Sequence, residues 1–170
     1  SIICYGQTGT GKTYTMTNLN TKNDDGILPR TIKDIFLEVE KEVTKQFLIK
    51  ASYLQIYNDK INDLLIPERK LLNIRENNDE GVFIEGLSKW VVKKKEDILK
   101  LLSKGEKHRK NAFTLVNDVS SRSHVIFNLT IETRKIENEK EIVNISNMKF
   151  VDLAGSERLR ITKAKGEQLS

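Results

Sequence analysis

The stretch Gly6-Gln7-Thr8-Gly9-Thr10-Gly11-Lys12-Thr13 decides how the rest of this 170-residue sequence is interpreted. It follows an apolar run, Ile2–Tyr5, that is typical of a short buried strand, and it leads into a polar helix expected to begin at Lys12. Glycines let a loop curl so that successive backbone N–H groups point inward at phosphate oxygens, and the following helix N-terminus adds partial positive charge. The match to G-x-x-x-x-G-K-[ST], placed between a strand and a helix, therefore predicts a nucleotide-binding loop.

A second motif closes another apolar strand, at Phe150-Val151-Asp152-Leu153-Ala154-Gly155-Ser156-Glu157. An aspartate at that position can hold Mg²⁺ through water, and Gly155 can bring its backbone N–H against a terminal phosphate because no Cβ intervenes. Strands often end in Asp, so this pattern alone is weak evidence. Downstream of a phosphate-binding loop it favours a γ-phosphate sensor.

A third motif, Asn117-Asp118-Val119-Ser120-Ser121-Arg122-Ser123-His124, precedes a strand. Three hydroxyls and a guanidinium offer donors and ligands for phosphate and magnesium. In isolation an ordinary serine-rich loop would be the better interpretation. Its position between the other two motifs keeps both interpretations open.

The remaining chain alternates strands and helices, which predicts an α/β fold. We expect helices over 29–44, 58–65 and 94–110, with Asp59, Lys60 and Asp63 as solvated positions of the second. Strands are expected over 46–57, 125–133 and 142–153, with two or three short ones between 71 and 92.

Composition excludes several protein classes. The chain is 38% hydrophobic and has one cysteine, which excludes a disulfide framework, and it lacks the run of about 18 apolar residues that a membrane-spanning helix needs. The net charge of +5 equals the surplus within 93–110, where eight basic residues face three acidic ones. A solvated helix face is the preferred interpretation, with attraction to an acidic polymer as the alternative. Nucleic acid is disfavoured because aromatic residues are not interleaved.

Together the three motifs resemble the P-loop, switch I and switch II of the kinesin motor domain, as GQTGTGKT followed by YTM, NDVSSRSH and VDLAGSE. The likeness extends through 26–36, 52–65 and 157–169, so it covers essentially the whole chain. It implies a P-loop NTPase of the α/β class, with a mixed central sheet flanked by helices, whose P-loop, switch I and switch II are 6–13, 117–124 and 152–157. Kinesin motor domains are about twice as long. The expectation is therefore a central fragment, without the N- and C-terminal parts, whose strand at Ile2 lacks a neighbour on one side.

The resemblance also implies roles for individual residues. Ser120 would help position the attacking water. Arg122 would pair with Glu157, and this pair would close over the γ-phosphate, which the N–H of Gly155 contacts, and help relay a proton from the attacking water. Tyr14 would lie against the base, with packing inside its helix as the alternative. The residues expected to bind the nucleotide are Gly6, Gln7, Thr8, Gly9, Thr10, Gly11, Lys12, Thr13, Tyr14, Asn117 and Ser121, and those expected to hold Mg²⁺ are Thr13, Ser121 and, through water, Asp152.

By the same resemblance the activity is that of a microtubule-stimulated ATPase using ATP and Mg²⁺, in the cytoplasm and on the microtubule cytoskeleton, without nucleic-acid binding or membrane insertion. A coiled-coil dimer is plausible for a longer chain. The alternative is a truncated nucleotide- or tubulin-binding fragment without motor activity. The cations expected to face acidic tubulin, each with an ordinary surface side chain as its alternative, are Arg75, Arg158, Arg160, Lys163 and Lys165.

Four further side chains are given no chemistry. We expect His108 at the surface, Cys4 and Trp90 in packing, and His124 in a structural hydrogen bond.

Overall fold

The computed structural model of the chain describes residues 1–19, 25–78, 81–111 and 119–157, apart from the side chains of residues 111, 119 and 120. Its elements are β1 (Ile2–Cys4), α1 (Lys12–Thr17), α2 (Ile27–Lys41), β2 (Gln46–Tyr57), β3 (Lys60–Asp63), β4 (Lys70–Leu72), β5 (Ile74–Asn77), β6 (Gly81–Ile84), β7 (Trp90–Val92), α3 (Lys95–Asn111), the 3₁₀ turn η1 (Val119–Arg122), β8 (His124–Glu137) and β9 (Lys140–Asp152).

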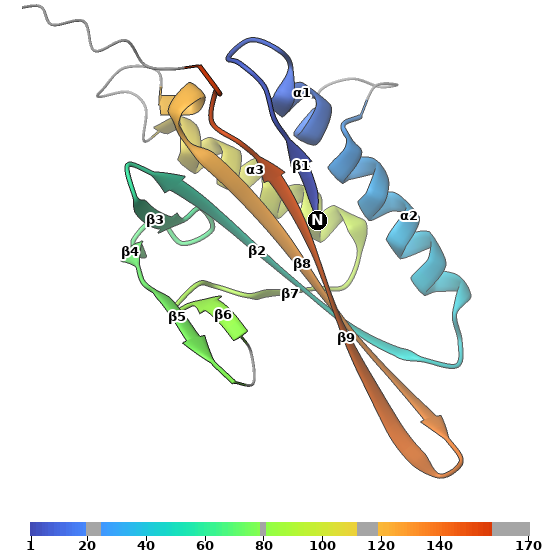
Figure 1. Cartoon of the computed structure of the whole chain (residues 1–170). Helices are drawn as coiled ribbons and strands as arrows, with labels where there is room; N and C mark the ends of the chain where they lie inside the picture. The colour runs from blue at the N-terminus through green and yellow to red at the C-terminus, as the bar shows by residue number, and fades with distance from the viewer. Residues whose placement is uncertain (20–24, 79–80, 112–118, 158–170) are drawn as a thin grey trace, which may run out of the picture.

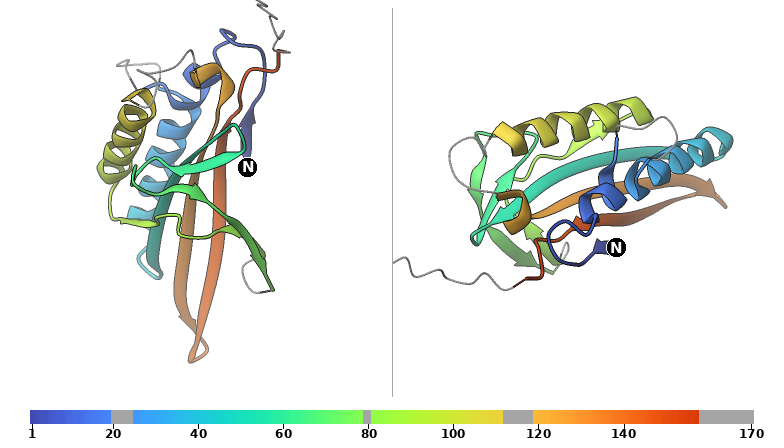
Figure 2. Two further views of the ribbon diagram at one scale, coloured as in Figure 1. Left: turned by 90° about the vertical axis from the view of Figure 1, so that its left-hand side faces the viewer. Right: turned by 90° about the horizontal axis from the view of Figure 1, so that it is seen from above.

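A seven-stranded sheet forms the frame of the molecule, in the order β1-β9-β8-β2-β3-β4, with β7 also paired to β2 (Figure 1). The β1–β9 pair is parallel and the other pairs are antiparallel, so the sheet is mixed as predicted. The three α-helices of the described chain lie on one face of it (Figure 2). None of the described helices is long and apolar enough to cross a membrane.

The core lies between this face and the helices, because alternate strand residues point toward them. Phe127 packs edge-on against Tyr53, with ring centroids 5.5 Å apart, and lies 6.5 Å from the ring of Phe150. The helices contribute the buried apolar side chains that complete this layer, namely Met16, Leu28, Ile32, Phe36, Ile98 and Leu102.

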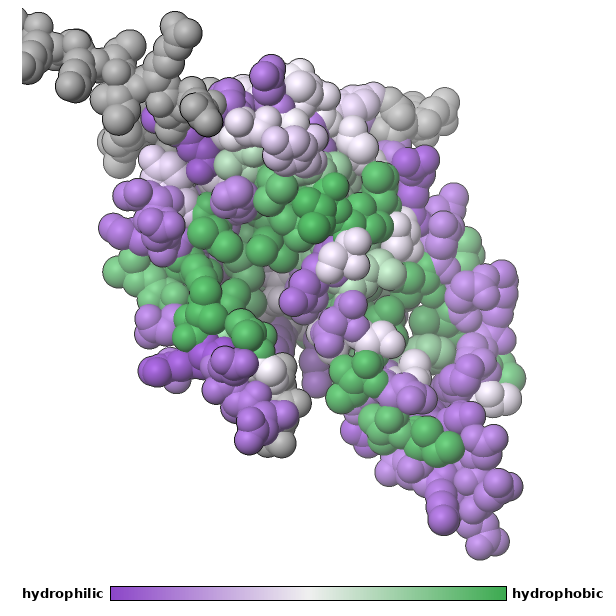
Figure 3. Space-filling model, viewed as in Figure 1, coloured by the Kyte–Doolittle hydropathy of each residue, from purple (hydrophilic) through white to green (hydrophobic). Residues whose placement is uncertain are grey.

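The opposite face of the sheet carries no helix of the described chain, and apolar side chains gather on its upper part (Figure 3). Strand β1 is at the end of the sheet order. Its residue Ile3 is 59% exposed, whereas Ile2 and Cys4, which point to the other face, are half-buried. Within the described residues, β1 pairs only with β9, so the expected open side of this strand is confirmed.

The helix predicted over 58–65 is wrong, because the segment folds back as strand β3 against β2. Asn58 and Asp59 have φ values of 48° and 58°, which are the left-handed conformations that a two-residue type I′ hairpin requires. Asn and Asp tolerate these angles better than other non-glycine residues. The turn chemistry of these two residues therefore gives a hairpin in place of the expected helix.

Asp63 is buried, at 1% exposure, so its assignment to a solvated position is also wrong. Its Oδ1 accepts hydrogen bonds from the backbone N–H groups of Leu65 and Ile66, at 2.8 and 3.1 Å, and its Oδ2 accepts one from Ser88 at 2.8 Å. One carboxylate thus ties the end of β3 to the segment that precedes β7.

Asp63→Asn is expected to destabilise the fold by about 3 kcal/mol. The new amide NH₂ would face the buried backbone N–H of Ser88, which would then have no hydrogen-bond acceptor. Chemical denaturation measures the free energy of unfolding. The control is Asp59→Asn, the same substitution at an exposed turn position, which should change it by less than about 0.5 kcal/mol. Equal unfolding midpoints for the two variants would contradict this role of Asp63.

The segment predicted to hold two or three short strands holds four, β4 to β7. The other predicted elements agree with the structure in kind and differ at their ends. Strand β2 has the predicted bounds, while α2 ends at Lys41, before the predicted residue 44. Strands β8 and β9 run further than expected, to a two-residue turn at Asn138 and Glu139, whose φ values are 51° and 61°.

Candidate functional site

The P-loop connects the carboxyl end of β1 to the first turn of α1 (Figure 1). Its three glycines, Gly6, Gly9 and Gly11, have φ values of 153°, 83° and 90°, conformations that side chains rarely allow. At Gly6 a Cβ would also meet Thr10 Oγ1 at 2.8 Å. The loop can therefore take this shape only with glycine at these positions.

Lys12 lies back over the loop that precedes it. Its Nζ donates hydrogen bonds to the carbonyl oxygens of Gly6 and Gln7, at 2.9 and 2.8 Å. The ammonium group thus lies beside the loop's own backbone, where a phosphate group can replace carbonyl partners as its acceptor.

Thr13 and Asp152, predicted as metal ligands, are brought together by the parallel pairing of β1 with β9. Thr13 Oγ1 donates a 2.5 Å hydrogen bond to Asp152 Oδ2, and the Asp152 side chain is only 6% exposed. Asp152 Oδ1 is buried and has no hydrogen-bond partner in the described part of the chain. A hydroxyl and a carboxylate with one buried oxygen left to satisfy fit Mg²⁺, a hard cation that keeps several of its waters.

The backbone of switch II joins the other two motifs. The N–H of Gly155 donates to the carbonyl oxygen of Ser121 at 2.7 Å, and the N–H of Ser156 donates to that of Gly6 at 3.1 Å. The N–H of Ala154 donates to His124 Nδ1 at 3.2 Å, which confirms the structural hydrogen bond expected for this histidine. Segments far apart in the sequence therefore meet at one end of the sheet.

Glu157 folds back onto the P-loop. Its carboxylate accepts hydrogen bonds from the Thr8 hydroxyl and, at 3.0 Å, from the Thr8 backbone N–H. The Thr8 hydroxyl bond lowers the pKa of Glu157, so the group is ionised at neutral pH. Gly155 permits this fold, because a Cβ there would lie 2.3 Å from the carboxylate. A backbone N–H of the P-loop thus donates a hydrogen bond to a carboxylate in this structure.

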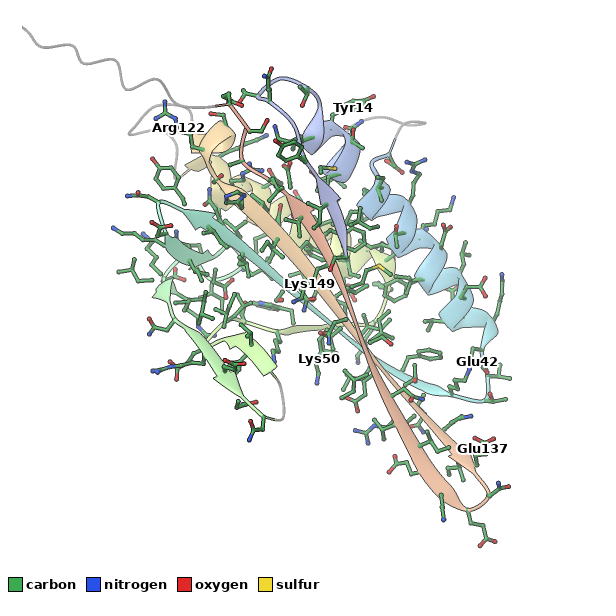
Figure 4. All side chains as sticks on the ribbon, in the orientation of Figure 1. Tyr14, Glu42, Lys50, Arg122, Glu137 and Lys149 are labelled. Carbon is green, nitrogen blue, oxygen red and sulfur yellow. The ribbon has the colours of Figure 1, made fainter. Side chains whose placement is uncertain are left out.

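Arg122 and Glu157, expected to form the switch pair, are not brought together. Arg122 is exposed at the end of η1 and points outward (Figure 4), and no ion pair joins it to Glu157 within the described residues. The N–H of Gly155, expected to face a phosphate, is likewise engaged with Ser121. The structure therefore shows the switch segments in contact through their backbones, with the predicted side-chain pair apart.

Some of the other predicted site residues lie in the described part of the chain, and the rest lie outside it. Tyr14 is 55% exposed on α1 (Figure 4), and Ser121 is half-buried. Arg75 is exposed on β5 and pairs with Glu85 at 3.1 Å. Ser120 belongs to η1, but its side chain is outside the described part. The remaining predicted residues also lie outside the described residues, namely Asn117, Arg158, Arg160, Lys163 and Lys165.

Arg109 is a residue of this site that the sequence interpretation missed, because the whole basic stretch 93–110 was assigned to solvent. Its side chain is 5% exposed, and its Nη1 lies 4.0 Å from Asp152 Oδ2 and 3.6 Å from Glu106 Oε1. The sequence carries a signal for this burial, since Ile98, Leu102 and Arg109 recur at the spacing of one helix face.

His108 and Trp90 also depart from expectation. His108 is half-buried, with its Nδ1 2.7 Å from the carbonyl oxygen of Leu64, so its assignment to the surface is wrong. Trp90 remains 39% exposed and is covered by Lys104, whose Nζ lies 5.1 Å from the ring centroid.

A hollow of about 680 Å³ lies away from these motifs, between the C-terminal half of α2 and strands β2 and β8. Its floor is apolar, formed by Ile35, Val39, Phe47 and Ile131. Because it lies far from the P-loop in Figure 1, it is no part of the candidate site.

Known proteins match this chain over nearly its whole length. The kinesin motor domain family matches residues 1–170. Kinesin-like protein KIN-7I of Oryza sativa subsp. japonica is 42% identical over 99% of this chain and 14% of its own length. Kinesin-like protein KIN-7N of Arabidopsis thaliana is 45% identical over 98% of this chain and 20% of its own length. Chromosome-associated kinesin KIF4B of Homo sapiens is 43% identical over 99% of this chain and 14% of its own length.

A solved structure agrees with these sequence matches. It is described as that of a fast kinesin, with implications for its ATPase mechanism and its interactions with microtubules. It matches with a TM-score of 0.89 and 33% identity, over 98% of this chain and 48% of its own. The expected P-loop NTPase fold is therefore confirmed, and the chain spans about half of that structure and a fifth or less of these curated relatives. The chain belongs to the kinesin motor domain family.

Proposed function

We propose that this chain is the phosphate-handling part of an ATP-dependent microtubule motor, which binds ATP with Mg²⁺ and hydrolyses it. Kinesin motor domains as a family are ATPases that move on microtubules. The observation that carries the proposal is the convergence of the three motifs, since switch II donates backbone hydrogen bonds to both the P-loop residue Gly6 and the switch I residue Ser121. Loops that respond to a γ-phosphate need such mutual contact to move together.

Two donor groups in the structure would have to change partners when the triphosphate binds. Its oxygens would take the N–H of Thr8 from Glu157 and the ammonium of Lys12 from the two loop carbonyls. Glu157, released from Thr8, would then be free to pair with Arg122. This exchange supplies two arrangements of switch II that differ in their contacts with nucleotide, as a switch requires.

Hydrolysis in this proposal uses positioned groups. A water held by Ser120 attacks the γ-phosphorus, and the bond from that phosphorus to the β-phosphate oxygen breaks. The water proton passes to the Glu157 carboxylate, which Arg122 pairs with and holds in place, and the products are ADP and phosphate. Gly155 would turn its N–H from Ser121 to the γ-phosphate. Thr13, Ser121 and, through water, Asp152 would hold Mg²⁺, which neutralises charge on the phosphates when bound.

The proposed partner is the microtubule, with the protein located in the cytoplasm on that filament. The cations proposed to contact acidic tubulin are Arg75, Arg158, Arg160, Lys163 and Lys165. The Arg75 side chain is 59% exposed and forms an ion pair with Glu85, which partly neutralises its charge, so its attraction for tubulin would be moderate.

Filament binding should weaken by roughly 10-fold between low and physiological ionic strength, because salt screens attraction between exposed charges. Co-sedimentation with microtubules at increasing NaCl measures this. Sucrose at matched osmolarity is the control and should leave binding unchanged. A flat binding curve across the salt series would argue against docking by these cations.

The competing function is that of a nucleotide- or tubulin-binding fragment without motor activity. The observation in its favour is the separation of Arg122 from Glu157 in the described part of the chain. Steady-state ATP hydrolysis by the full-length protein, with and without microtubules, separates the two. A motor should hydrolyse ATP faster on addition of microtubules. ATP binding without any hydrolysis above buffer, at all microtubule concentrations, would favour the competing function.

A further inference from the structure

Helix α3 approaches strand β2 unusually closely at Gly105. A Cβ on Gly105 would lie 2.2 Å from Cδ1 of Tyr53, whose ring is buried at 1% exposure and packed against Phe127. Glycine in the middle of a helix lowers helix stability by about 1 kcal/mol relative to alanine. The close contact between α3 and β2 at this position therefore comes at a cost in helix stability. The close approach places the next residue, Glu106, beside the Tyr53 hydroxyl.

The Tyr53 hydroxyl donates a hydrogen bond to Glu106 Oε1. Burial, and then the negative charge of Glu106, raise the pKa of Tyr53 well above its usual value, so the hydroxyl keeps its proton. Tyr53 therefore acts as donor and Glu106 as acceptor. This contact fixes one oxygen of a carboxylate that is only 22% exposed.

The same Glu106 oxygen is 3.6 Å from Nη1 of Arg109, and that nitrogen is 4.0 Å from Asp152 Oδ2. One guanidinium nitrogen thus lies between two carboxylates, beyond direct hydrogen-bond distance from either. With one positive and two negative charges, the cluster keeps a net charge of −1. Asp152, the residue that the proposed function assigns to Mg²⁺, is one of the two carboxylates of this cluster.

We propose that Glu106 is a positioning residue for the magnesium site, an inference that rests on the proposed function. It draws Arg109 back from Asp152, so that the aspartate keeps its negative charge available to the cation. Without the Glu106 charge, Arg109 would pair fully with Asp152 and neutralise it. Both the lost charge and the tighter Arg109–Asp152 pair would weaken the hold on Mg²⁺.

The test is a Mg²⁺ titration of nucleotide affinity in the full-length protein, with a fluorescent ADP analogue as the probe. Glu106→Gln should raise the Mg²⁺ concentration for half-maximal binding by roughly 10-fold. ADP affinity in EDTA should equal that of the wild type, because no hydrogen bond or ion pair among the described residues joins Glu106 to the P-loop. Glu96→Gln, the same change in the first turn of α3 and partnered with Lys95 at 3.9 Å, is the matched control and should leave both values unchanged.

Tyr53→Phe gives a second test, because it is not expected to lower Mg²⁺ affinity as Glu106→Gln does. It frees the Glu106 oxygen to hold Arg109 more strongly, so Mg²⁺ should bind as tightly as in the wild type or up to roughly 3-fold more tightly. A purely structural role for the cluster predicts instead that both variants lose Mg²⁺ affinity together. Thermal unfolding verifies that each variant is folded, and Tyr53→Phe decides the matter if Glu106→Gln does not fold.

The outcomes separate the inference from the proposed function. A wild-type Mg²⁺ requirement in Glu106→Gln, an equal loss of its ADP affinity in EDTA, or weaker Mg²⁺ binding in Tyr53→Phe would overturn the positioning role alone. A wild-type protein that binds ADP without any Mg²⁺ dependence would overturn the proposed magnesium site, and the role of Glu106 with it.

Discussion

Lys12→Ala is expected to weaken ATP binding by roughly 100-fold, the loss that follows from removing one charge-assisted contact to a phosphate. In the structure the Lys12 ammonium is held by two carbonyl oxygens of the P-loop, within reach of the path the phosphates would take. Alanine removes the only side-chain cation of residues 6–13. Equilibrium titration of the full-length protein with a fluorescent ATP analogue measures the change.

The control for this prediction is Lys41→Ala, the same substitution at an exposed position of α2, where the lysine pairs with Glu38 at 2.7 Å. Its ATP affinity should match that of the wild type. If Lys12→Ala and Lys41→Ala bind ATP equally well, Lys12 does not contact phosphate and the P-loop assignment fails.

Glu157→Ala is expected to lower ATP turnover by roughly 1,000-fold, since a positioned proton acceptor contributes a factor of this order. ATP binding should be spared. The carboxylate that now occupies the Thr8 N–H would be absent, so the triphosphate would meet no competing anion on that donor. Single-turnover phosphate release, measured beside ATP affinity, distinguishes the two effects.

Arg122→Ala should share this phenotype if Arg122 and Glu157 form a pair once nucleotide is bound. Glu38→Ala, on the exposed face of α2, is the control and should turn over ATP at the wild-type rate. Unchanged phosphate release in Glu157→Ala would remove that residue from the proposed mechanism.

The P-loop and switch motifs could be predicted from the sequence because their chemistry is local. Glycines at fixed offsets from Lys12 and Thr13 specify a loop shape before any tertiary contact forms. The mixed sheet and the open side of β1 followed from the family resemblance, which reflects the whole chain.

The surroundings of the magnesium site could not be predicted in the same way. Arg109 looked solvated because it lies in the basic stretch 93–110, and its burial beside Asp152 results from the packing of α3 against the sheet, which brings Gly105 against the ring of Tyr53. Asp63 was misplaced because two left-handed turn residues, Asn58 and Asp59, converted an apparent helix into a hairpin. Both errors concern charged residues whose partners are chosen by tertiary packing.

A structure of the full-length protein with Mg²⁺ and a non-hydrolysable ATP analogue would show directly whether the three motifs form one ATP site. The expected result is Lys12 Nζ on a phosphate oxygen, the Thr8 N–H on phosphate with Glu157 withdrawn, and Mg²⁺ beside Thr13 and Asp152. An analogue bound elsewhere, with Lys12 still on the carbonyls of Gly6 and Gln7 and Glu157 still on Thr8, would contradict it.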